Sequence, residues 1–565
     1  MKAPPPAKTE SGGKPLAVRE PETASMRTSD GIRLDADVYR PQGGGEYPIL
    51  LMRQPYGRRI ASTVVYAHPS WYAANGYVVV VQDVRGRGTS EGSFRIFADD
   101  VRDGGEAIAW AARLPGSTGR VGMYGFSYQG HTQLLALAAG SPELRALCPG
   151  MATWDVRTDW AYEGGAFCFA NNLYWGIQMG AEQARLACDV EAFEALYAAS
   201  RSLPLNSSCP CRPDVLERFS RYTHYLDWVR NPGPGPYWDS IGVGRALDGK
   251  AMDAPMLHFG GWYDFMLPGT LRLFKEASAR STKPQKLVIG PWAHMPWGRN
   301  VGAVDFGADA QGFVDKLQIA WFDRFLKDID NGVDRASPVK LFDLIAKTWR
   351  EFDRWPEPKR RAHHIHSIGL AAVSDSGRLS EKAPVGFIED AIVSDPWRPA
   401  PSLGGHNAEP LGMQNRSHIE NRADVLTYTS DPLLSALMLA GDVELILAVR
   451  SDQPSFDVSA VLSRVTPDGR AFNLTQGHLR VDAPAPNVVR VGMRALCATL
   501  SARDALRLSL AGANFPAFAI NPGTGAAPAE ARLIGNRIVT LFVASGARTP
   551  TRLELPVVDQ EDLPC

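Results

Sequence analysis

The sequence has almost no net charge and no long apolar run. Its 60 Lys and Arg residues balance 61 Asp and Glu residues, which gives a formal charge of −1 at pH 7. A chain balanced in this way offers no basic surface for nucleic acid or an anionic membrane, so we expect neither as a partner. No stretch approaches the ~20 apolar residues that a membrane-spanning helix needs. We therefore expect a globular protein that works in water.

Cysteine is also scarce. The 7 cysteines are Cys148, Cys168, Cys188, Cys209, Cys211, Cys497 and Cys565. An odd number scattered through a long chain argues against a disulfide framework. Cys209 and Cys211 stand too close together for a usual zinc knuckle and have no second pair. We expect no metal and no cofactor.

The N-terminal segment lacks the apolar core of a secretory signal peptide. Residues 1–22 are instead rich in Pro, Lys, Glu, Gly and Ser. We predict that residues 1–25 form a disordered tail. The expected location is the cytoplasm, although a leader that had already been removed would leave no trace, so that alternative stays open.

Four continuous apolar runs predict strands that are buried on both faces of a parallel sheet. They are Pro48–Met52, Tyr77–Val81, Pro255–Phe259 and Lys286–Ile289. A helical stretch, about Val101 to Leu114, follows the second run. Residues 32–39 alternate in polarity as a half-buried edge strand does. Strands and helices that alternate in this order predict a doubly wound α/β sheet.

Two other kinds of segment interrupt and follow this sheet. Residues 147–250 hold aromatic helical segments and a Pro/Gly break at 231–236, which predicts an inserted helical cap. Residues 336–565 hold short alternating segments between turn signals, which predicts an all-β sandwich or jelly roll. The α/β domain then consists of residues 26–146 and 251–335.

A serine stands on a predicted sharp turn between a strand and a helix. The segment Gly125-Phe126-Ser127-Tyr128-Gln129-Gly130 follows an apolar run and precedes a helix-forming run. Glycines on both sides let the backbone turn tightly and let the helix pack close to the strand. This is the arrangement of a nucleophile elbow, with a helix N-terminus beside the hydroxyl. We predict Ser127 as a nucleophile; the alternative is an ordinary strand–helix turn.

A serine nucleophile needs a general base and a group that orients the base. Asp264 comes soon after the third apolar run and His294 soon after the fourth, at the carboxyl ends of strands, where α/β sheets place their sites. Asp264 could instead cap a helix. Among the other histidines, His131 would sit one turn into the helix and point along it. His258 lies inside an apolar strand and is expected to be a core residue.

Three further histidines form a short cluster. His363, His364 and His366 follow the basic run 359–361. We interpret them as part of a solvated face. The alternative, a metal site, would lack a carboxylate partner.

A glycine-rich run at 85–92 superficially suggests a phosphate-binding loop. It lacks the Gly-Lys-Ser/Thr ending, and no Gly-x-Gly-x-x-Gly phase fits a dinucleotide turn. We therefore predict a structural loop, with Asp83 and Arg85 paired beneath the site.

Several segments together resemble the superfamily of cocaine esterases and X-prolyl dipeptidyl aminopeptidases, which includes α-amino-acid ester hydrolases. In family order they are residues 30–34, 53–56, 83–92, the elbow, 261–264 and 290–294. The resemblance runs from about Met26 to the C-terminus. It implies an α/β hydrolase fold with an inserted helical cap, a C-terminal all-β jelly-roll domain, and a serine hydrolase activity.

The resemblance adds one site residue, Tyr56. In this family the tyrosine after the first buried strand donates its phenol to the oxyanion. A phenol placed ~3 Å from that oxygen would complement the backbone N–H of Tyr128. Without the resemblance, Tyr56 is explained equally well as a core aromatic that covers the end of the strand.

The resemblance also bears on the acyl group. Amino-ester hydrolases of this family bind the substrate ammonium with carboxylates, two of which follow the catalytic aspartate. Here residues 265–268, after Asp264, include no acid. Asp155, Asp159 and Glu163 could supply one carboxylate, but a cluster is not apparent. This disfavours an α-amino acyl group and an X-prolyl peptide.

Cocaine-esterase-like members build their acyl pocket from aromatic residues of the cap instead. Trp160 and Trp175 match two such residues by their spacing, and Met266, beside Phe265, stands where a phenylalanine lines the pocket. An apolar or aromatic acyl group is therefore favoured. The alternative is that both tryptophans belong to the core of the cap.

The leading hypothesis is a serine hydrolase that cleaves small-molecule carboxylic esters through an acyl-enzyme. An X-prolyl dipeptidyl peptidase or an α-amino-acid ester or amide acylase would use the same residues. A remoter alternative is a non-catalytic protein whose β-domain binds carbohydrate. The sequence leaves the alcohol, the physiological substrate and a homo-oligomeric state open.

Overall fold

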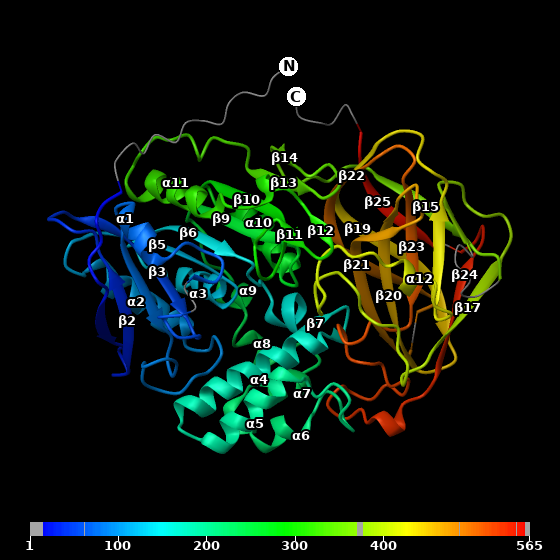
Figure 1. The fold of residues 1–565 in the computed structure, drawn as a ribbon, viewed down its shortest axis with the longest axis horizontal. Coiled ribbons are helices and arrows are strands. Elements are labelled where there is room, and N and C mark those ends of the chain that lie inside the picture. The colour runs from blue at the N-terminus through cyan, green and yellow to red at the C-terminus, as the bar shows by residue number, and fades with distance from the viewer. Residues whose placement is uncertain (1–14, 61–62, 370–376, 485, 550, 560–565) are drawn as a thin grey trace.

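The computed structural model describes residues 15–60, 63–369, 377–484, 486–549 and 551–559. The chain forms three parts: a sheet flanked by helices, a helical segment beneath it, and an all-β part beside both (Figure 1). Within the described ranges, no helix combines the length and apolar character that crossing a bilayer requires.

The first part is built on a 10-stranded sheet in the order β1-β2-β4-β3-β5-β6-β9-β10-β13-β14. The strands are β1 (Glu22–Arg27), β2 (Arg33–Tyr39), β3 (Tyr47–Gln54), β4 (Val78–Asp83), β5 (Ser117–Phe126), β6 (Leu144–Gly150), β9 (Met256–Tyr263), β10 (Gln285–Ala293), β13 (Val339–Asp343) and β14 (Thr348–Phe352). From β4 to β13 every neighbouring pair is parallel. The predicted parallel α/β sheet is therefore present.

Helices cover both faces of this sheet because its central strands are apolar on both sides. They are α1 (Pro69–Ala74), α2 (Asp100–Ala112), α3 (Tyr128–Leu137), α10 (Leu267–Arg280) and α11 (Val314–Leu326). In β3, Ile49 and Leu51 belong to one core with α2, α3 and α10. Leu50 and Met52 belong to a second core with α1 and α11. The strand's two-residue period thus divides the core in two.

The start of the chain differs from the prediction. Residues 1–14 lie outside the described residues, but the predicted tail reaches too far, since β1 begins at Glu22 and pairs with β2. For the same reason β2 is not an edge strand. Its polar face is also buried, because Asp35 and Asp37 bond to side chains of neighbouring segments.

The second part, residues 151–255, lies between β6 and β9. It contains α4 (Phe169–Leu186), α5 (Val190–Arg201), α6 (Asp214–Arg218), α7 (Tyr225–Arg230), α8 (Pro236–Asp239), α9 (Val243–Ala246), the helical turns Arg157–Ala161 and Ser220–Tyr222, and the hairpin β7 (Tyr162–Glu163) and β8 (Ala166–Phe167). We call it the inserted segment. In Figure 1 its longer helices lie below the first sheet, next to the all-β part.

The third part is an 11-stranded arrangement. Its strands are β15 (Arg360–His366), β16 (Gly377–Ser380), β17 (Ile388–Ser394), β18 (Val425–Ser430), β19 (Leu437–Ser451), β20 (Ser455–Val465), β21 (Ala471–Asp482), β22 (Val488–Leu500), β23 (Ala505–Ala511), β24 (Val539–Ser545) and β25 (Arg552–Val558). The remaining short elements are β11 (Asn300–Val301), β12 (Val304–Asp305), α12 (Ser417–Glu420) and the turns Ala308–Ala310 and Leu533–Gly535. We call the 11-stranded part the C-terminal β-domain.

The boundary between the first and third parts lies later than predicted. Strands β13 and β14 continue the first sheet to Phe352, past the predicted boundary at residue 335. One hydrophobic core also runs across the boundary, since it includes Leu287 and Ile289 of β10 together with Leu445 and Leu447 of β19. The two parts are therefore packed as one body rather than joined by a linker.

The β7–β8 hairpin joins the inserted segment to the C-terminal β-domain. Its tip, Gly164, accepts a hydrogen bond from the Arg480 N–H of β21 at 2.8 Å. Gly164 has φ +53°, and a Cβ there would lie 2.0 Å from the His478 carbonyl oxygen. Its neighbour Gly165 has φ +82° but open space, with the nearest atom 3.8 Å from a Cβ. Of these two glycines, only Gly164 is constrained both by its positive φ and by a close contact with β21.

These two glycines provide a matched pair of stability tests. Gly165→Ala should cost only the strain of a left-handed alanine, ~1–2 kcal/mol. Gly164→Ala should cost a further ~1–3 kcal/mol because the methyl group overpacks against β21. Thermal melting of both variants checks this ranking. Equal melting temperatures would mean that the hairpin does not sit tightly on the β-domain.

Candidate active site

Ser127 stands between β5 and α3 in a strained conformation, with φ 59° and ψ −125°. Its N–H donates to the Gly150 carbonyl at 3.0 Å, and its own carbonyl accepts from the His131 N–H at 2.9 Å. These bonds hold the turn from both sides. The predicted nucleophile elbow is therefore the local structure.

The flanking glycines are required by close contacts. A Cβ at Gly125, whose φ is +138°, would lie 2.4 Å from the Gln129 side chain. A Cβ at Gly130 would lie 2.6 Å from the Gly150 carbonyl oxygen. Helix α3 can therefore pack against β6 only because position 130 has no side chain.

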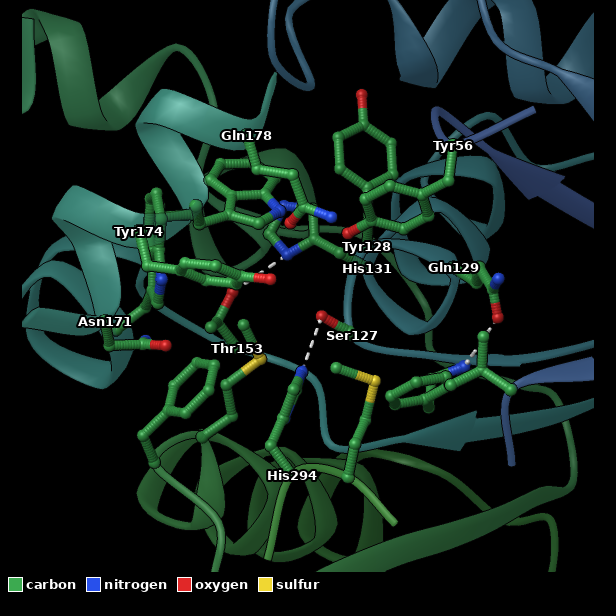
Figure 2. Close-up of a pocket in the computed structure, with 18 of the residues that line it drawn as sticks. Tyr56, Ser127, Tyr128, Gln129, His131, Thr153, Asn171, Tyr174, Gln178 and His294 are labelled. Atoms are coloured by element: carbon green, nitrogen blue, oxygen red, sulfur yellow. Dashed lines mark hydrogen bonds between the residues drawn. The ribbon is translucent and has the colours of Figure 1, made fainter. Parts of the chain in front are cut away.

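Ser127, His294 and Asp264 form a continuous hydrogen-bonded chain. The Ser127 Oγ lies 3.0 Å from His294 Nε2, and His294 Nδ1 lies 2.7 Å from Asp264 Oδ1 (Figure 2 shows the first of these bonds). Asp264 follows β9 directly and His294 follows β10 directly, and these strands are parallel neighbours. The Asp264 side chain is fully buried, whereas that of His294 is 13% exposed. The short contact between Nδ1 and the Asp264 carboxyl group favours the tautomer in which Nδ1–H donates to Asp264 and Nε2 is left to accept the serine proton.

Two other histidines considered from the sequence are bonded elsewhere. His131 Nδ1 lies 2.8 Å from the Thr153 hydroxyl, and Nε2 lies 3.1 Å from the Ile241 carbonyl oxygen. Burial lowers the pKa of His131 to about 4. Burial likewise lowers the pKa of His258 to about 4, and its Nε2 bonds to Gln285. His131 thus has no ring nitrogen available for Ser127, and His258 is the core residue that was expected.

The cluster at His363, His364 and His366 lies on β15. The interpretation as a solvated face is wrong for His363, which is buried because the strand's alternation turns it inward. Burial lowers the pKa of that imidazole. Among the residues that the structure describes, no group of three or more His, Cys, Asp or Glu is placed to hold a metal ion.

Two predicted oxyanion donors lie beside Ser127. Burial raises the pKa of the Tyr56 phenol, although its neighbours Trp175 and Ser127 lower it, so the phenol keeps its proton. The Tyr128 phenol bonds to Asp100 instead, at 3.2 Å. The backbone N–H of Tyr128, at the start of α3, donates to no backbone acceptor in the described part of the chain. A side-chain O–H and a backbone N–H thus both lie next to the serine.

A cavity of about 350 Å³ opens beside Ser127 and His294. Trp160, Trp175, Phe265 and Met266 all line it, as do both predicted donors. Trp160 and Trp175 also pack on each other at 5.3 Å between ring centroids, and each contacts Trp228. The two tryptophans therefore belong both to the core of the inserted segment and to the cavity wall.

The three acids considered for a substrate ammonium have other partners. Asp159 accepts hydrogen bonds from the Trp154 and Asp155 N–H groups, and burial raises its pKa to about 6. Asp155 caps the following turn. Glu163 is paired with Arg494 at 2.6 Å. No carboxylate is among the described residues that line the cavity.

The predicted pairing of Asp83 with Arg85 is wrong. Asp83 accepts from Arg58 at 2.6 Å, whereas Arg85 bonds to Asp103 at 2.7 Å and to Asp30 at 3.1 Å. Strand β4 ends at Asp83, so the chain has turned before Arg85 and the two side chains point to different neighbours.

The loop after β4 nevertheless has a structural role. Gly86 and Gly88 both have positive φ, +69° and +57°. A Cβ at Gly88 would lie 2.0 Å from the Asp83 carboxylate, and one at Gly86 would lie 2.2 Å from the Phe94 nitrogen. Its glycines thus allow close packing, as expected for a structural loop.

The cavity includes residues that the sequence analysis did not identify. Asn171, Tyr174 and Gln178 share one face of α4 with Trp175 and line the wall opposite His294 (Figure 2). Asn171 and Gln178 lie four residues before and three residues after the predicted pocket residue Trp175, and that helical spacing was a usable signal. Met295, next to His294 in sequence, lines the mouth.

Two family models match the chain. Residues 30–296 match the X-Pro dipeptidyl-peptidase (S15 family) model. Residues 331–554 match the model of the X-Pro dipeptidyl-peptidase C-terminal non-catalytic domain. The first match contains all three residues of the hydrogen-bonded chain.

Known proteins resemble the chain over nearly its whole length. The cocaine esterase of Rhodococcus sp. (strain MB1 Bresler) is 29% identical over 561 residues, which is 94% of this chain and 97% of the esterase. An aminopeptidase from a marine sediment archaeon (Thaumarchaeota archaeon) has a similar fold, with a TM-score of 0.78, 22% identity, and 95% and 96% of the two chains covered. An α-amino acid ester hydrolase follows with a TM-score of 0.74 and 20% identity, over 98% of this chain and all of the other. The chain belongs to the X-Pro dipeptidyl-peptidase (S15) family and is a serine hydrolase of the cocaine-esterase type.

Proposed function

We propose that this protein hydrolyses carboxylic esters with an uncharged, apolar or aromatic acyl group, through an acyl-enzyme on Ser127. The observation that carries the proposal is the bonded chain from Ser127 Oγ through His294 to the buried Asp264. A buried carboxylate stabilises the imidazolium that forms when His294 takes the serine proton. The 29% identical relative is a cocaine esterase, which is consistent with ester hydrolysis.

The reaction follows from these positions. Ser127 Oγ attacks the ester carbonyl while His294 Nε2 takes its proton, and the carbonyl oxygen becomes an oxyanion. Tyr56 O–H and the Tyr128 N–H donate to that oxygen. The imidazolium then returns the proton to the leaving alcohol, and water repeats the sequence on the acyl-enzyme.

The cavity supports an uncharged substrate. Its wall combines tryptophan, phenylalanine and methionine side chains with neutral polar groups. Its mouth is also apolar: Ile60 is 79% exposed and Met295 is 48% exposed. An ammonium group entering this cavity would lose its water without meeting a carboxylate among the described lining residues.

Two other functions use parts of the same structure. An X-prolyl dipeptidyl peptidase or an amino-acid ester or amide acylase would need the same three residues plus a site for the substrate amine, for which the described cavity wall offers no carboxylate. A carbohydrate-binding role for the C-terminal β-domain has less support. The described residues that line a groove between β21 and β22 of that domain include no aromatic side chain for a sugar to stack on.

We also propose a finer division of the chain. The inserted segment acts as a helical cap over the site, since it supplies Trp160 and Trp175 to the cavity. The C-terminal β-domain is a jelly roll that begins near residue 353. A small-molecule ester or acyl substrate as a partner and a cytoplasmic location stay predictions, and a homo-oligomeric state stays open.

Ser127→Ala should abolish ester hydrolysis and leave the fold intact, because the half-buried Ser127 lines the cavity and its hydroxyl contributes no core volume. His294→Ala should be as damaging, and the double variant no worse, because these residues act as a unit. Hydrolysis of p-nitrophenyl esters and thermal melting measure both effects. His131→Ala is the control, and a larger loss in that variant than in His294→Ala would mean that the base is misassigned.

Tyr56→Phe tests the oxyanion site by removing a single oxygen. We expect kcat to fall by ~10²–10³-fold with the fold unchanged, because one of two preorganised donors is lost. Tyr197→Phe removes the same atom from a side chain that is 53% exposed and outside the cavity lining, and it should have little effect. If Tyr56→Phe keeps wild-type kcat, Tyr56 is only a wall residue.

The acyl preference can be tested with two esters that differ only in an ammonium group. Methyl phenylacetate should have a kcat/KM at least ~10-fold above that of phenylglycine methyl ester, because ~1.4 kcal/mol of uncompensated desolvation already gives this factor. The comparison belongs at about pH 6, below the usual α-amino pKa. Trp175→Ala should narrow the ratio by slowing the apolar ester, whereas Trp397→Ala, 51% exposed and outside the cavity lining, should not. A preference for the amino ester would mean that a carboxylate reaches the substrate.

A further inference from the structure

The catalytic aspartate is held by few direct contacts. Its Oδ1 bonds to His294, but its buried Oδ2 has no hydrogen-bond partner among the described residues. Surrounding donors would ordinarily fix such a carboxylate. The direction in which Asp264 points therefore depends largely on where its own backbone is placed.

That backbone is bonded to the C-terminal β-domain. Arg494 of β22 donates through Nη1 to the Asp264 carbonyl oxygen at 2.9 Å and to the Phe265 carbonyl oxygen at 3.0 Å. Both carbonyls belong to the short loop between β9 and α10. One guanidinium nitrogen thus links two consecutive peptide units of the loop that carries the aspartate.

Arg494 is in turn held by the inserted segment. Its Nη2 donates to Glu163 Oε2, on the β7–β8 hairpin, at 2.6 Å. His406 Nε2 lies 2.8 Å from the same oxygen, and Gln476 donates to His406 Nδ1 at 3.2 Å. The guanidinium therefore lies where all three parts of the chain meet.

Burial and charge make this arrangement rigid. The side chains of Arg494, Glu163 and His406 are 8%, 15% and 2% exposed. Burial, followed by the nearby Arg494 charge, lowers the pKa of His406, so its ring is neutral. Burial opposes ionisation of Glu163, but Arg494 and then His406 lower its pKa well below the usual range. The ion pair carries no net charge, and each partner would be costly to leave alone.

We propose that Arg494 is a positioning residue for catalysis: it fixes the Asp264–Phe265 backbone and so aims the Asp264 carboxylate at His294. The C-terminal β-domain then takes part in the reaction without contacting the substrate. Glu163 and His406 hold the guanidinium in place. The inference rests on the proposed roles of Ser127, His294 and Asp264.

Arg494→Ala should lower kcat by ~10²-fold, the cost of displacing a catalytic group by about 1 Å. KM should change less than kcat, because Arg494 is not itself among the residues that line the cavity and reaches that lining only through the Phe265 carbonyl. Arg494→Lys keeps the charge on a single donor nitrogen and should recover part of kcat. Glu163→Gln keeps the shape of the side chain, and its kcat should fall less than that of Arg494→Ala. The matched control is Arg464→Ala, which breaks a 2.8 Å ion pair with buried Asp504 elsewhere in the same domain. It should lower the melting temperature and leave kcat unchanged.

Two results would overturn this role: a kcat of Arg494→Ala near that of wild type, or an equal loss of kcat in Arg464→Ala. If Arg494→Ala does not fold, Arg494→Lys carries the test, and wild-type kcat in that variant would also overturn it. Ser127→Ala distinguishes a failure of the proposed triad from a failure of the Arg494 positioning role. If Ser127→Ala keeps activity, the proposed triad fails; if it is inactive while Arg494→Ala is not, only the positioning role fails.

Discussion

The backbone of Ser127 is the constraint on which the rest of the site depends. A non-glycine residue at φ 59° and ψ −125° costs of order 1–3 kcal/mol and persists only where its surroundings enforce it. Here the Gly150 carbonyl accepts its N–H, and the missing side chain at Gly130 lets α3 press against β6. This turn places Ser127 on the cavity wall and leaves the Tyr128 N–H without a backbone acceptor in the described part of the chain. The proposed nucleophile and one proposed oxyanion donor thus come from the same turn.

The positions of the other two residues of the proposed triad follow from the order of the sheet. Because β9 and β10 are parallel neighbours, the loops after them emerge at the same edge, and Asp264 and His294 meet there. The strands fix only the starts of these loops, because β9 ends at Tyr263 and β10 ends at Ala293. Beyond those ends, the Asp264 loop is bonded to Arg494 of the C-terminal β-domain, and the cavity wall comes from the inserted segment. A single core that spans β10 and β19 keeps these parts in register.

The features that could be predicted from the sequence are those that short stretches of the chain encode. The elbow, the parallel strands and the positions of Asp264 and His294 follow from runs of a few residues, and the structure places them together. Tyr56 was indicated only by the family resemblance. The pairing of Asp83 failed because its partner, Arg58, is set by how β2, β3 and β4 lie side by side, which no local pattern records. Arg494 was missed for the same reason, since it lies 230 residues along the chain from the loop it contacts.

The acids considered for binding a substrate ammonium group are bonded within the protein itself, and this bears on the proposed preference for an uncharged acyl group. Of the acids considered for binding a substrate ammonium group, Glu163 lies on the β7–β8 hairpin of the inserted segment, which also supplies Trp160 and Trp175 to the cavity wall. It is paired with Arg494, so its charge is already neutralised. Asp159 is likewise committed to the N–H groups of Trp154 and Asp155. A carboxylate whose charge is already balanced by a guanidinium offers a substrate cation less net attraction than an unpaired one. Glu163 is thus used to hold Arg494 and, through it, the Asp264 loop, and the described residues of the cavity wall include no carboxylate.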